Sequence, residues 1–174
     1  SVLPGLLPPM PKKTAQELRL LQDVAGAAQC DVPPFRAPHH SSSLASLMGG
    51  TARALPGEIS MAHGGVLFLD ELSEFPHTVL NQLRQPLETG HIRVNRAQCQ
   101  HLYPAQFQLV AAMNPCPCGL AGDPDCRCRC TPDRIRRYRQ GISGPLMDRI
   151  DLHITLQRPS SEFLLIKSST NASY

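Results

Sequence analysis

The 174-residue sequence contains no tryptophan, and aromatic residues make up only 5% of it. It also lacks any apolar run that approaches the ~20 residues a helix needs to cross a membrane, which excludes a membrane-spanning protein. Residues 1–9 are apolar but are interrupted by proline and have no basic segment, so they do not form a secretory signal. We therefore expect a cytoplasmic protein with no membrane partner.

Charged residues are scarce at 18%, and lysine accounts for few of the 17 basic residues. The other 14 basic residues are arginines, and six of them lie between Arg127 and Arg139. Arginine favours bidentate contacts with phosphate or carboxylate, so a nucleotide or nucleic-acid partner is one interpretation. A solvated helix face is the alternative.

Proline and glycine are abundant, at 17 and 12 residues, which is typical of a loop-rich globular domain. The short apolar run Val66–Leu69 predicts a strand that is buried on both faces of a parallel sheet. Phe107–Met113 predicts a second buried strand. Two less apolar stretches predict a hairpin, residues 92–94 with 100–103, and alternation at Leu152, Ile154 and Leu156 predicts a last strand.

Helices are expected between these strands. Thr14 and Glu17 form a capping-box pattern that predicts a helix start, and Gly26 predicts its end. Thr131 with Pro132 predicts the start of an arginine-rich helix. Further helices are expected near 44–48, from Pro76 with a break at Pro86, and from Gly144–Pro145 through Ile150. Alternating strands and helices predict an α/β fold with a mostly parallel sheet, flanking helices and an inserted β-hairpin.

Polar side chains follow both buried strands. Asp70 and Glu71 come directly after the first, where a carboxylate pair can bind Mg²⁺ and orient a water molecule. Asn114 follows the second strand and could help to hold that water, or could simply close a turn before Pro115. On its own, the acidic pair is also consistent with a strand that ends in surface acids.

Five of the seven cysteines lie between Cys116 and Cys130. In a cytosolic chain such crowding indicates a metal site sooner than disulfides. Two Cys-x-Cys turns, Cys116 with Cys118 and Cys128 with Cys130, can converge on one zinc ion, and Cys126 is a fifth candidate. Reduced structural thiols are the alternative.

Several segments together resemble the ComM/YifB family, bacterial AAA+ ATPases of the magnesium-chelatase-like type. The most distinctive are the double-histidine segment 35–41, the Cys-Pro-Cys segment 110–119 and the Gly-Pro-Leu-Met-Asp-Arg segment 143–151. Less distinctive ones are 56–60, 62–72 and 84–88. The resemblance implies a partial AAA+ P-loop NTPase core over residues 1–158 and an irregular tail over 159–174.

The resemblance also implies roles for the polar residues that follow the two strands, for Arg149 and for the cysteines. Asp70 would bind Mg-ATP, and Glu71 and Asn114 would act on the attacking water. Arg149 would be an arginine finger that enters a neighbouring subunit, or else a helix-end arginine paired with Asp148 or Asp151. The family pattern selects Cys128 and Cys130 as the second zinc pair and leaves Cys126 spare.

The family relationship further implies a hexameric, ATP-driven DNA helicase that promotes branch migration in natural transformation. Residues 90–107 match a hairpin that faces the central pore in related helicases, where Arg93 and Arg96 could touch DNA, unless they are plain surface charges. His39 and His40 could bind metal, meet a neighbouring subunit or make local hydrogen bonds.

The sequence departs from the family at one point that matters for activity. No Gly-x-x-x-x-Gly-Lys-Ser/Thr motif occurs in it, although the family places one just before the segment that corresponds to Leu3–Pro9. We therefore expect an internal segment of a longer ATPase, inactive alone. Two other functions fit the pattern: the ATPase motor of a magnesium chelatase, and a zinc-stapled nucleic-acid-binding module.

Overall fold

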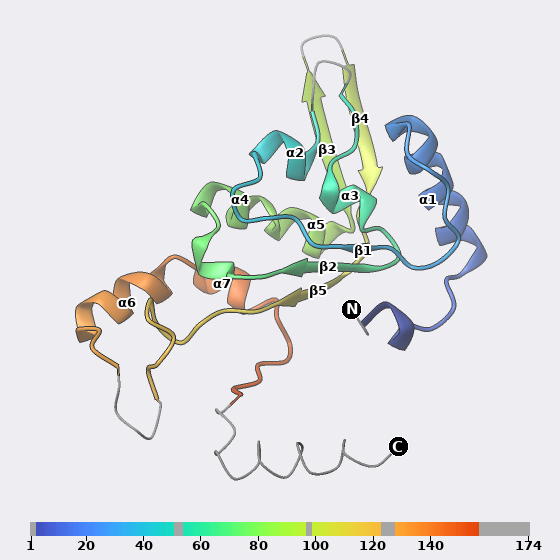
Figure 1. The fold of residues 1–174 in the computed structure, drawn as a ribbon. Helices are drawn as coiled ribbons and strands as arrows, with labels where there is room; N and C mark the ends of the chain where they lie inside the picture. Colours follow the sequence, from blue (N-terminus) through green and yellow to red (C-terminus); the bar gives the residue numbers. More distant parts are fainter. Residues whose placement is uncertain (1–2, 51–53, 97–98, 123–127, 157–174) are drawn as a thin grey trace, which may run out of the picture.

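The computed structural model describes residues 3–50, 54–96, 99–122 and 128–156. Its centre is a three-stranded parallel sheet in the order β1–β2–β5. These strands are Phe35–Arg36, Val66–Leu69 and Gln108–Ala111. A separate antiparallel hairpin pairs β3 (His91–Arg96) with β4 (Cys99–Pro104) and projects away from the sheet (Figure 1). The predicted α/β class, parallel sheet and hairpin are confirmed.

Helices lie over one face of this sheet and beyond its two ends, and short ones predominate. Their bounds are α1 Lys12–Ala25, α2 Leu44–Met48, α3 Glu58–Met61, α4 His77–Gln82, α5 Arg84–Thr89, α6 Pro132–Gln140 and α7 Gly144–Met147, with 3-10 turns η1 Leu3–Leu6 and η2 Leu72–Glu74. Helices α2, α4 and α5 lie over one face of the sheet, and α6 lies at the far end from α1 (Figure 1). None of the described helices is long and apolar enough to cross a membrane.

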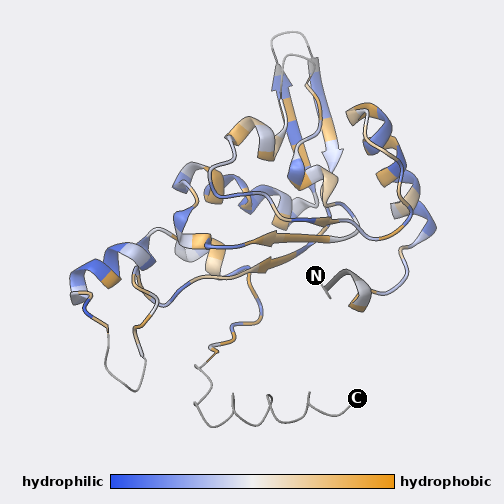
Figure 2. Ribbon diagram, in the orientation of Figure 1, coloured by the Kyte–Doolittle hydropathy of each residue, from blue (hydrophilic) through white to orange (hydrophobic). Residues whose placement is uncertain are grey.

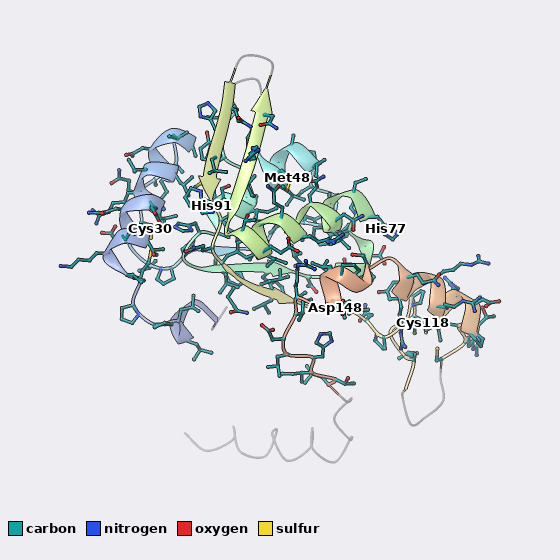
Figure 3. All side chains as sticks on the ribbon, turned by 180° about the vertical axis from the view of Figure 1, so that it is seen from behind. Cys30, Met48, His77, His91, Cys118 and Asp148 are labelled. Carbon is teal, nitrogen blue, oxygen red and sulfur yellow. The ribbon has the colours of Figure 1, made fainter. Side chains whose placement is uncertain are left out.

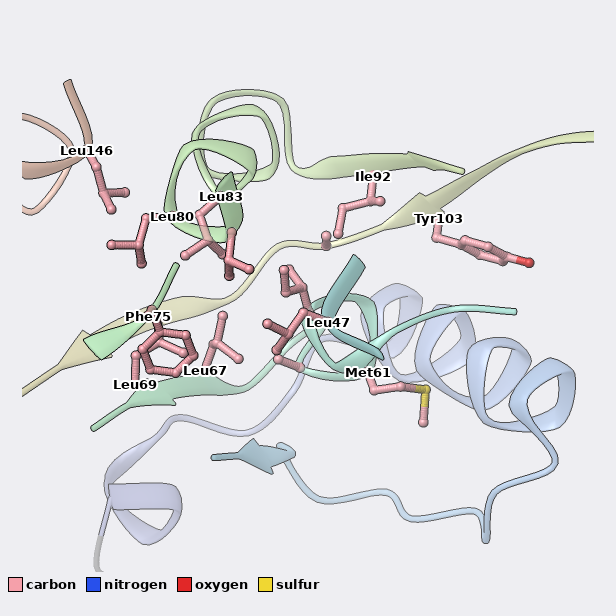
Figure 4. Packing of buried hydrophobic residues seen from close by; sticks show 14 of the residues in the cluster. Leu47, Met61, Leu67, Leu69, Phe75, Leu80, Leu83, Ile92, Tyr103 and Leu146 are labelled. Atoms are coloured by element: carbon pink, nitrogen blue, oxygen red, sulfur yellow. The ribbon is translucent and has the colours of Figure 1, made fainter. Parts of the chain in front are cut away.

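The hydrophobic core lies between the sheet and the helices on that face (Figure 4). Leu67 and Leu69 of β2 are almost fully buried and belong to one cluster with Leu47 of α2 and Leu80 of α4. Strand β2 is apolar along its whole length, as its colour in Figure 2 shows. The core therefore fixes the end of β2, where the acidic pair follows.

Strand β5 is less buried than its sequence predicts. Gln108 is exposed and Leu109–Ala111 are half-buried. The strand pairs with β2 on one side, and within the described part of the chain no strand pairs its other side. An edge strand keeps more contact with solvent than a central one, which explains the difference.

Two helix boundaries differ from the sequence prediction. Helix α1 begins at Lys12 and not at a Thr14 cap, because Pro11 is the N-cap and its carbonyl accepts the first helical hydrogen bond, from the Ala15 N–H at 3.0 Å. The helix after Pro76 breaks at Leu83 rather than at Pro86. That break places Pro86 in the first turn of α5. The N–H groups of a first turn have no acceptor within the helix, so the missing N–H of proline removes no hydrogen bond there.

The expected last strand does not form. Residues 151–156 have no regular structure, and Leu152, Ile154 and Leu156 are 73%, 71% and 88% exposed. Alternation of apolar side chains predicts a strand only where a neighbouring strand supplies hydrogen bonds, and no described strand does so here. Helix α7 also ends at Met147, short of the predicted Ile150. The expected tail, 159–174, lies outside the described residues.

Candidate functional site

Two acidic residues and an amide follow the carboxyl ends of adjacent parallel strands. Asp70 and Glu71 come directly after β2, and Asn114 comes shortly after β5. All three residues are exposed. Since parallel neighbours end at the same edge of a sheet, the three side chains share an edge that a ligand can reach.

Backbone hydrogen bonds join the two strand ends beyond the regular pairing. The register sets Leu69 opposite Ala111. One residue further, the Ala112 N–H donates to the Leu69 carbonyl at 2.9 Å, and the Leu72 N–H donates to the Ala112 carbonyl at 2.9 Å. The turn that carries the acidic pair is therefore tied to the chain that leads to Asn114.

The backbone of Glu71 has an unusual conformation. Its φ of 52° and ψ of 48° lie in the left-handed region, which non-glycine residues seldom adopt. The Glu71 N–H donates to Asp70 Oδ1 at 2.9 Å. Such a conformation costs of order 1–3 kcal/mol and is found more often at functional sites than elsewhere.

A histidine contacts the second acid of this pair. His40 Nδ1 lies 3.0 Å from Glu71 Oε2, with the His40 side chain 32% exposed. The sequence indicated no such partner for His40, so sequence reasoning missed this contact. The segments that carry the two residues follow neighbouring parallel strands, β1 and β2, and no local sequence pattern shows that these strands are neighbours.

A second cluster lies beside α6 and contains only cysteines. The sulfurs of Cys116, Cys118, Cys128 and Cys130 all lie within 4.8 Å of one another. The Cys116–Cys118 distance is 3.3 Å, Cys116–Cys128 is 3.7 Å and Cys118–Cys128 is 3.6 Å. A tetrahedral zinc ion with Zn–S bonds of ~2.3 Å places its sulfurs about 3.8 Å apart. The four thiols therefore fit zinc closely, while Cys126 lies outside the described residues.

The thiols differ in acidity. Burial acts to raise the pKa of Cys116, but hydrogen bonds from Cys118 and from the Ala121 N–H lower this pKa to about 6. A backbone hydrogen bond with Cys130 acts to lower the pKa of Cys128, but burial and the neighbouring thiols raise it to about 11. One thiolate therefore forms readily, and a divalent cation would favour deprotonation of the others.

The arginine-rich helix α6 is attached to this cysteine loop. Thr131 caps the helix, since its side chain accepts from the Arg134 N–H at 3.3 Å. The Arg139 guanidinium donates twice to the Pro115 carbonyl, at 3.2 and 3.1 Å. Cys118 lies beside this helix in Figure 3. The predicted cap and helix are confirmed, and the loop and the helix form one unit.

Arg149 contacts none of the residues at the strand edge. It forms an ion pair with Glu88 of α5 and donates to the Pro145 carbonyl. The expected local partners, Asp148 and Asp151, are therefore wrong. Its Nε is buried and has no hydrogen-bond partner among the described residues.

Arg93 and Arg96 are carried by β3. The Arg93 side chain is exposed on the projecting hairpin. The side chain of Arg96 lies outside the described part of the structure. The hairpin therefore presents at least one arginine to solvent, away from the strand edge (Figure 1).

Comparison with known proteins decides the family. The family model "Magnesium chelatase, subunit ChlI" matches residues 1–164. The chain belongs to this family. It is 44% identical over 164 residues to the uncharacterized protein YifB of Salmonella typhimurium, which covers 91% of this chain and 32% of that protein. It is 49% identical over 159 residues to the competence protein ComM of Haemophilus influenzae, with 88% and 31% covered.

A third relative is less similar in sequence. The magnesium-chelatase 67 kDa subunit of Chlorobaculum parvum is 31% identical over 71 residues, which covers 41% of this chain and 12% of that subunit. The chain is thus more similar in sequence to ComM and YifB than to this chelatase subunit. The chain spans about a third of the length of the ComM and YifB relatives.

Proposed function

We propose that this ChlI-family chain supplies the Mg²⁺-binding and water-orienting residues of an ATP-driven DNA motor of the ComM type. The observation that carries the proposal is the common edge of β2 and β5, where Asp70, Glu71 and Asn114 follow adjacent parallel strands. The 49% identity to ComM, over 88% of the chain, supports the choice of motor.

Each residue at this edge has a distinct task in the proposed reaction. Asp70 would hold Mg²⁺, and the ion would supply positive charge against the phosphates of ATP. Glu71 accepts a hydrogen bond from the attacking water and orients it. Asn114 offers both a donor and an acceptor to the same water or to the γ-phosphate.

The test uses the intact protein in which this chain occurs together with a P-loop. Glu71→Gln should abolish ATP turnover and leave ATP binding in place, because the amide keeps the shape of the side chain but is not a base. Glu74→Gln, an exposed neighbour on η2, is the matched control and should keep turnover. Full turnover in Glu71→Gln would refute the assignment.

The DNA part of the proposal has a separate test. Turnover that rises with added DNA supports a ComM-type motor. Turnover unaffected by DNA favours the second candidate, the ATPase motor of a magnesium chelatase, which the match to the Chlorobaculum parvum subunit supports.

Exposed Arg93 on the projecting hairpin is the proposed DNA contact, and Arg96 of the same strand is the second candidate. Arg93→Gln should weaken DNA binding and lower the slope of log affinity against log salt by roughly one unit, since one phosphate contact is lost. Arg19→Gln on α1, which pairs with Asp31, is the control. An unchanged slope in Arg93→Gln would remove this residue from the DNA contact.

Arg149 is the proposed arginine finger in an oligomeric, hexameric ring. In the single chain it pairs with Glu88, so entry into a neighbouring site requires that pair to open. Arg149→Ala should stop turnover without loss of ATP binding. Mixed rings of Arg149→Ala and Glu71→Gln subunits should regain part of the turnover, because each variant damages a different side of the shared site. No recovery in verified mixed rings would argue against this role.

The cysteine cluster is the proposed site of a structural zinc ion. Four thiolates close the coordination sphere, so the ion would stabilise the loop rather than react. Elemental analysis of protein purified without chelator should find about one zinc per chain, as one tetrahedral site requires. Cys116→Ser combined with Cys118→Ser should lose it, whereas Cys126→Ser and the exposed control Cys30→Ser should keep it. A folded, zinc-free wild type would refute the site.

A further inference from the structure

Helix α6 carries a concentration of positive charge at one end of the molecule. Between Cys128 and Gln140 the chain has five arginines and a single acid, Asp133. None of the residues of the helix is buried, and its four arginines are all exposed. Figure 1 shows the helix at the far end from α1 and apart from the β3–β4 hairpin. The charge of α6 is therefore presented to solvent and not packed into the core.

One side of this helix already has partners within the chain. A groove of about 670 Å³ lies along that side, lined by Pro132, Ile135, Arg136, Arg139, Gln140 and Ile142. Arg139 donates to the Pro115 carbonyl, and Arg136 forms an ion pair with Asp133 at 2.7 Å. The arginines beside the groove therefore have acceptors of their own.

The other side of α6 carries two arginines without such acceptors. Arg134 and Arg137 are exposed, and neither lines the groove. Residues three apart are neighbours on a helix surface, so the two side chains form one face, which we call the α6 arginine face. Within the described part of the chain, neither side chain has an ion pair or a hydrogen bond. Like charges at this spacing repel each other, and a bound anion would remove that repulsion.

The chemistry of this face favours the phosphates of a nucleic acid over isolated carboxylates. Guanidinium groups bind phosphate in a bidentate manner. Phosphates recur every ~3.4 Å along each DNA strand, so two arginines with Cβ atoms about 5–6 Å apart can reach two phosphates of one strand. Half-buried Tyr138 follows Arg134 by four residues on the same side, and an aromatic ring beside basic residues is typical of nucleic-acid surfaces.

We propose that the α6 arginine face is a second DNA-binding surface, on which Arg134 and Arg137 contact backbone phosphates. The proposal rests on DNA as the partner proposed above, but on neither the hairpin nor the strand edge. Contacts to phosphate carry no sequence information, so the surface binds DNA of any sequence. The hairpin lies elsewhere on the molecule, so the two contributions to binding should add.

The test measures DNA binding by the intact, P-loop-containing protein over a series of salt concentrations, with a non-hydrolysable ATP analogue present. The probes are a labelled oligothymidine strand and a labelled duplex of mixed sequence. Arg134→Gln combined with Arg137→Gln should weaken binding of at least one probe. It should lower the slope of log affinity against log salt by about 1.4 units for a single strand or about 1.8 units for a duplex, since two phosphate contacts are lost.

Two matched variants control for charge and for folding. Arg134→Lys combined with Arg137→Lys keeps both charges and should keep most of the slope. Lys12→Gln combined with Lys13→Gln removes two exposed charges at the start of α1 and should leave the slope unchanged. If the double glutamine variant fails to fold, Arg137→Gln alone should lower the slope by about half as much.

Two results would overturn the proposal. One is a slope that the Arg134 and Arg137 glutamine variants lower no more than the Lys12 and Lys13 control does. The other is an unchanged slope with a smaller oligomer in sedimentation, which would show that the α6 arginine face docks an acidic surface of a second copy.

Failure of this inference is distinguishable from failure of the proposed function. If Arg93→Gln lowers the slope and the α6 variants do not, the hairpin keeps its role and only the inference fails. If the α6 variants lower the slope and Arg93→Gln does not, the inference stands and the hairpin contact is refuted. A wild-type protein that binds neither probe would refute both.

Discussion

His63 is a fully buried ionisable side chain at the junction of α1, α3 and the β4–β5 connection. Its side chain is 1% exposed, its Nε2 lies 3.1 Å from Glu17 Oε2, and its Nδ1 accepts from the Gln106 N–H at 3.1 Å. The neutral Nε2–H tautomer satisfies both contacts. Burial lowers the pKa of His63, and the hydrogen bond with Glu17 only partly opposes this effect.

This lowered pKa predicts an acid-dependent loss of stability. The unfolded chain binds the His63 proton below a pH of about 6.5, whereas the folded chain resists it until a lower pH. The free energy of unfolding should therefore fall as the pH drops below about 6.5. In His63→Gln that part of the slope should be smaller, as measured by urea unfolding at a series of pH values.

The control for this experiment is His77→Gln, because His77 is exposed at the start of α4. That variant should keep the wild-type dependence on pH. If His63→Gln and His77→Gln show the same slope, His63 is not the group responsible.

At the scale of the elements, the backbones that lead into β1 and β2 approach each other closely at Gly65. A Cβ atom on Gly65 would overlap the backbone oxygen and nitrogen of Pro34. The same Pro34 carbonyl accepts from the Val66 N–H at 2.8 Å, and the Gly65 carbonyl accepts from the Gln108 N–H at 2.9 Å. Close approach of two backbones therefore aligns all three strands.

Gly65→Ala is expected to destabilise the protein by roughly 1–3 kcal/mol or more, since the overlap is with backbone and cannot relax by side-chain rotation. Gly144→Ala is the matched control, because a Cβ atom added to Gly144 would meet nothing within 4 Å and its φ is ordinary. Denaturant midpoints of the two variants give the comparison. Equal midpoints would show that the close approach of the two backbones does not affect the stability of the protein.

The elements that the sequence predicted well are those with local signals. The apolar run of β2, the hairpin and the capped helix α6 all depend on residues close together in the chain. The strand expected at Leu152–Leu156 is wrong because alternation cannot show whether a neighbour is present. The exposure of β5 was missed for the same reason.

In the candidate site, too, the features with a local sequence signal were predicted and those without one were not. Cysteine spacing predicted two turns that converge, and the four sulfurs do lie together, although metal binding stays a prediction. The His40–Glu71 contact and the Arg149–Glu88 pair join distant segments, so only the register of the sheet and the packing of helices could reveal them.

For the whole molecule, we expect no ATP hydrolysis by these 174 residues alone. In the function proposed above, Asp70 and Glu71 act on a bound nucleotide, but the sequence contains no P-loop motif to supply the amides and the lysine that hold the β- and γ-phosphates. Phosphate release by the purified chain should equal that of its Glu71→Gln variant. Turnover in the chain that Glu71→Gln abolishes would contradict this expectation.

The topology of the sheet also has a kinetic consequence. The hairpin β3–β4 pairs neighbouring segments, and such pairs close in microseconds. The parallel pairs β1–β2 and β2–β5 instead join segments separated by whole helices, so their loop-closure entropy must be overcome first, and their formation is slow. The turn with Asp70 and Glu71 meets the end of β5 only in that late step. We therefore expect the hairpin to be ordered during refolding before the ends of β2 and β5 come together, with the apolar strand β2 exposed to solvent in that interval.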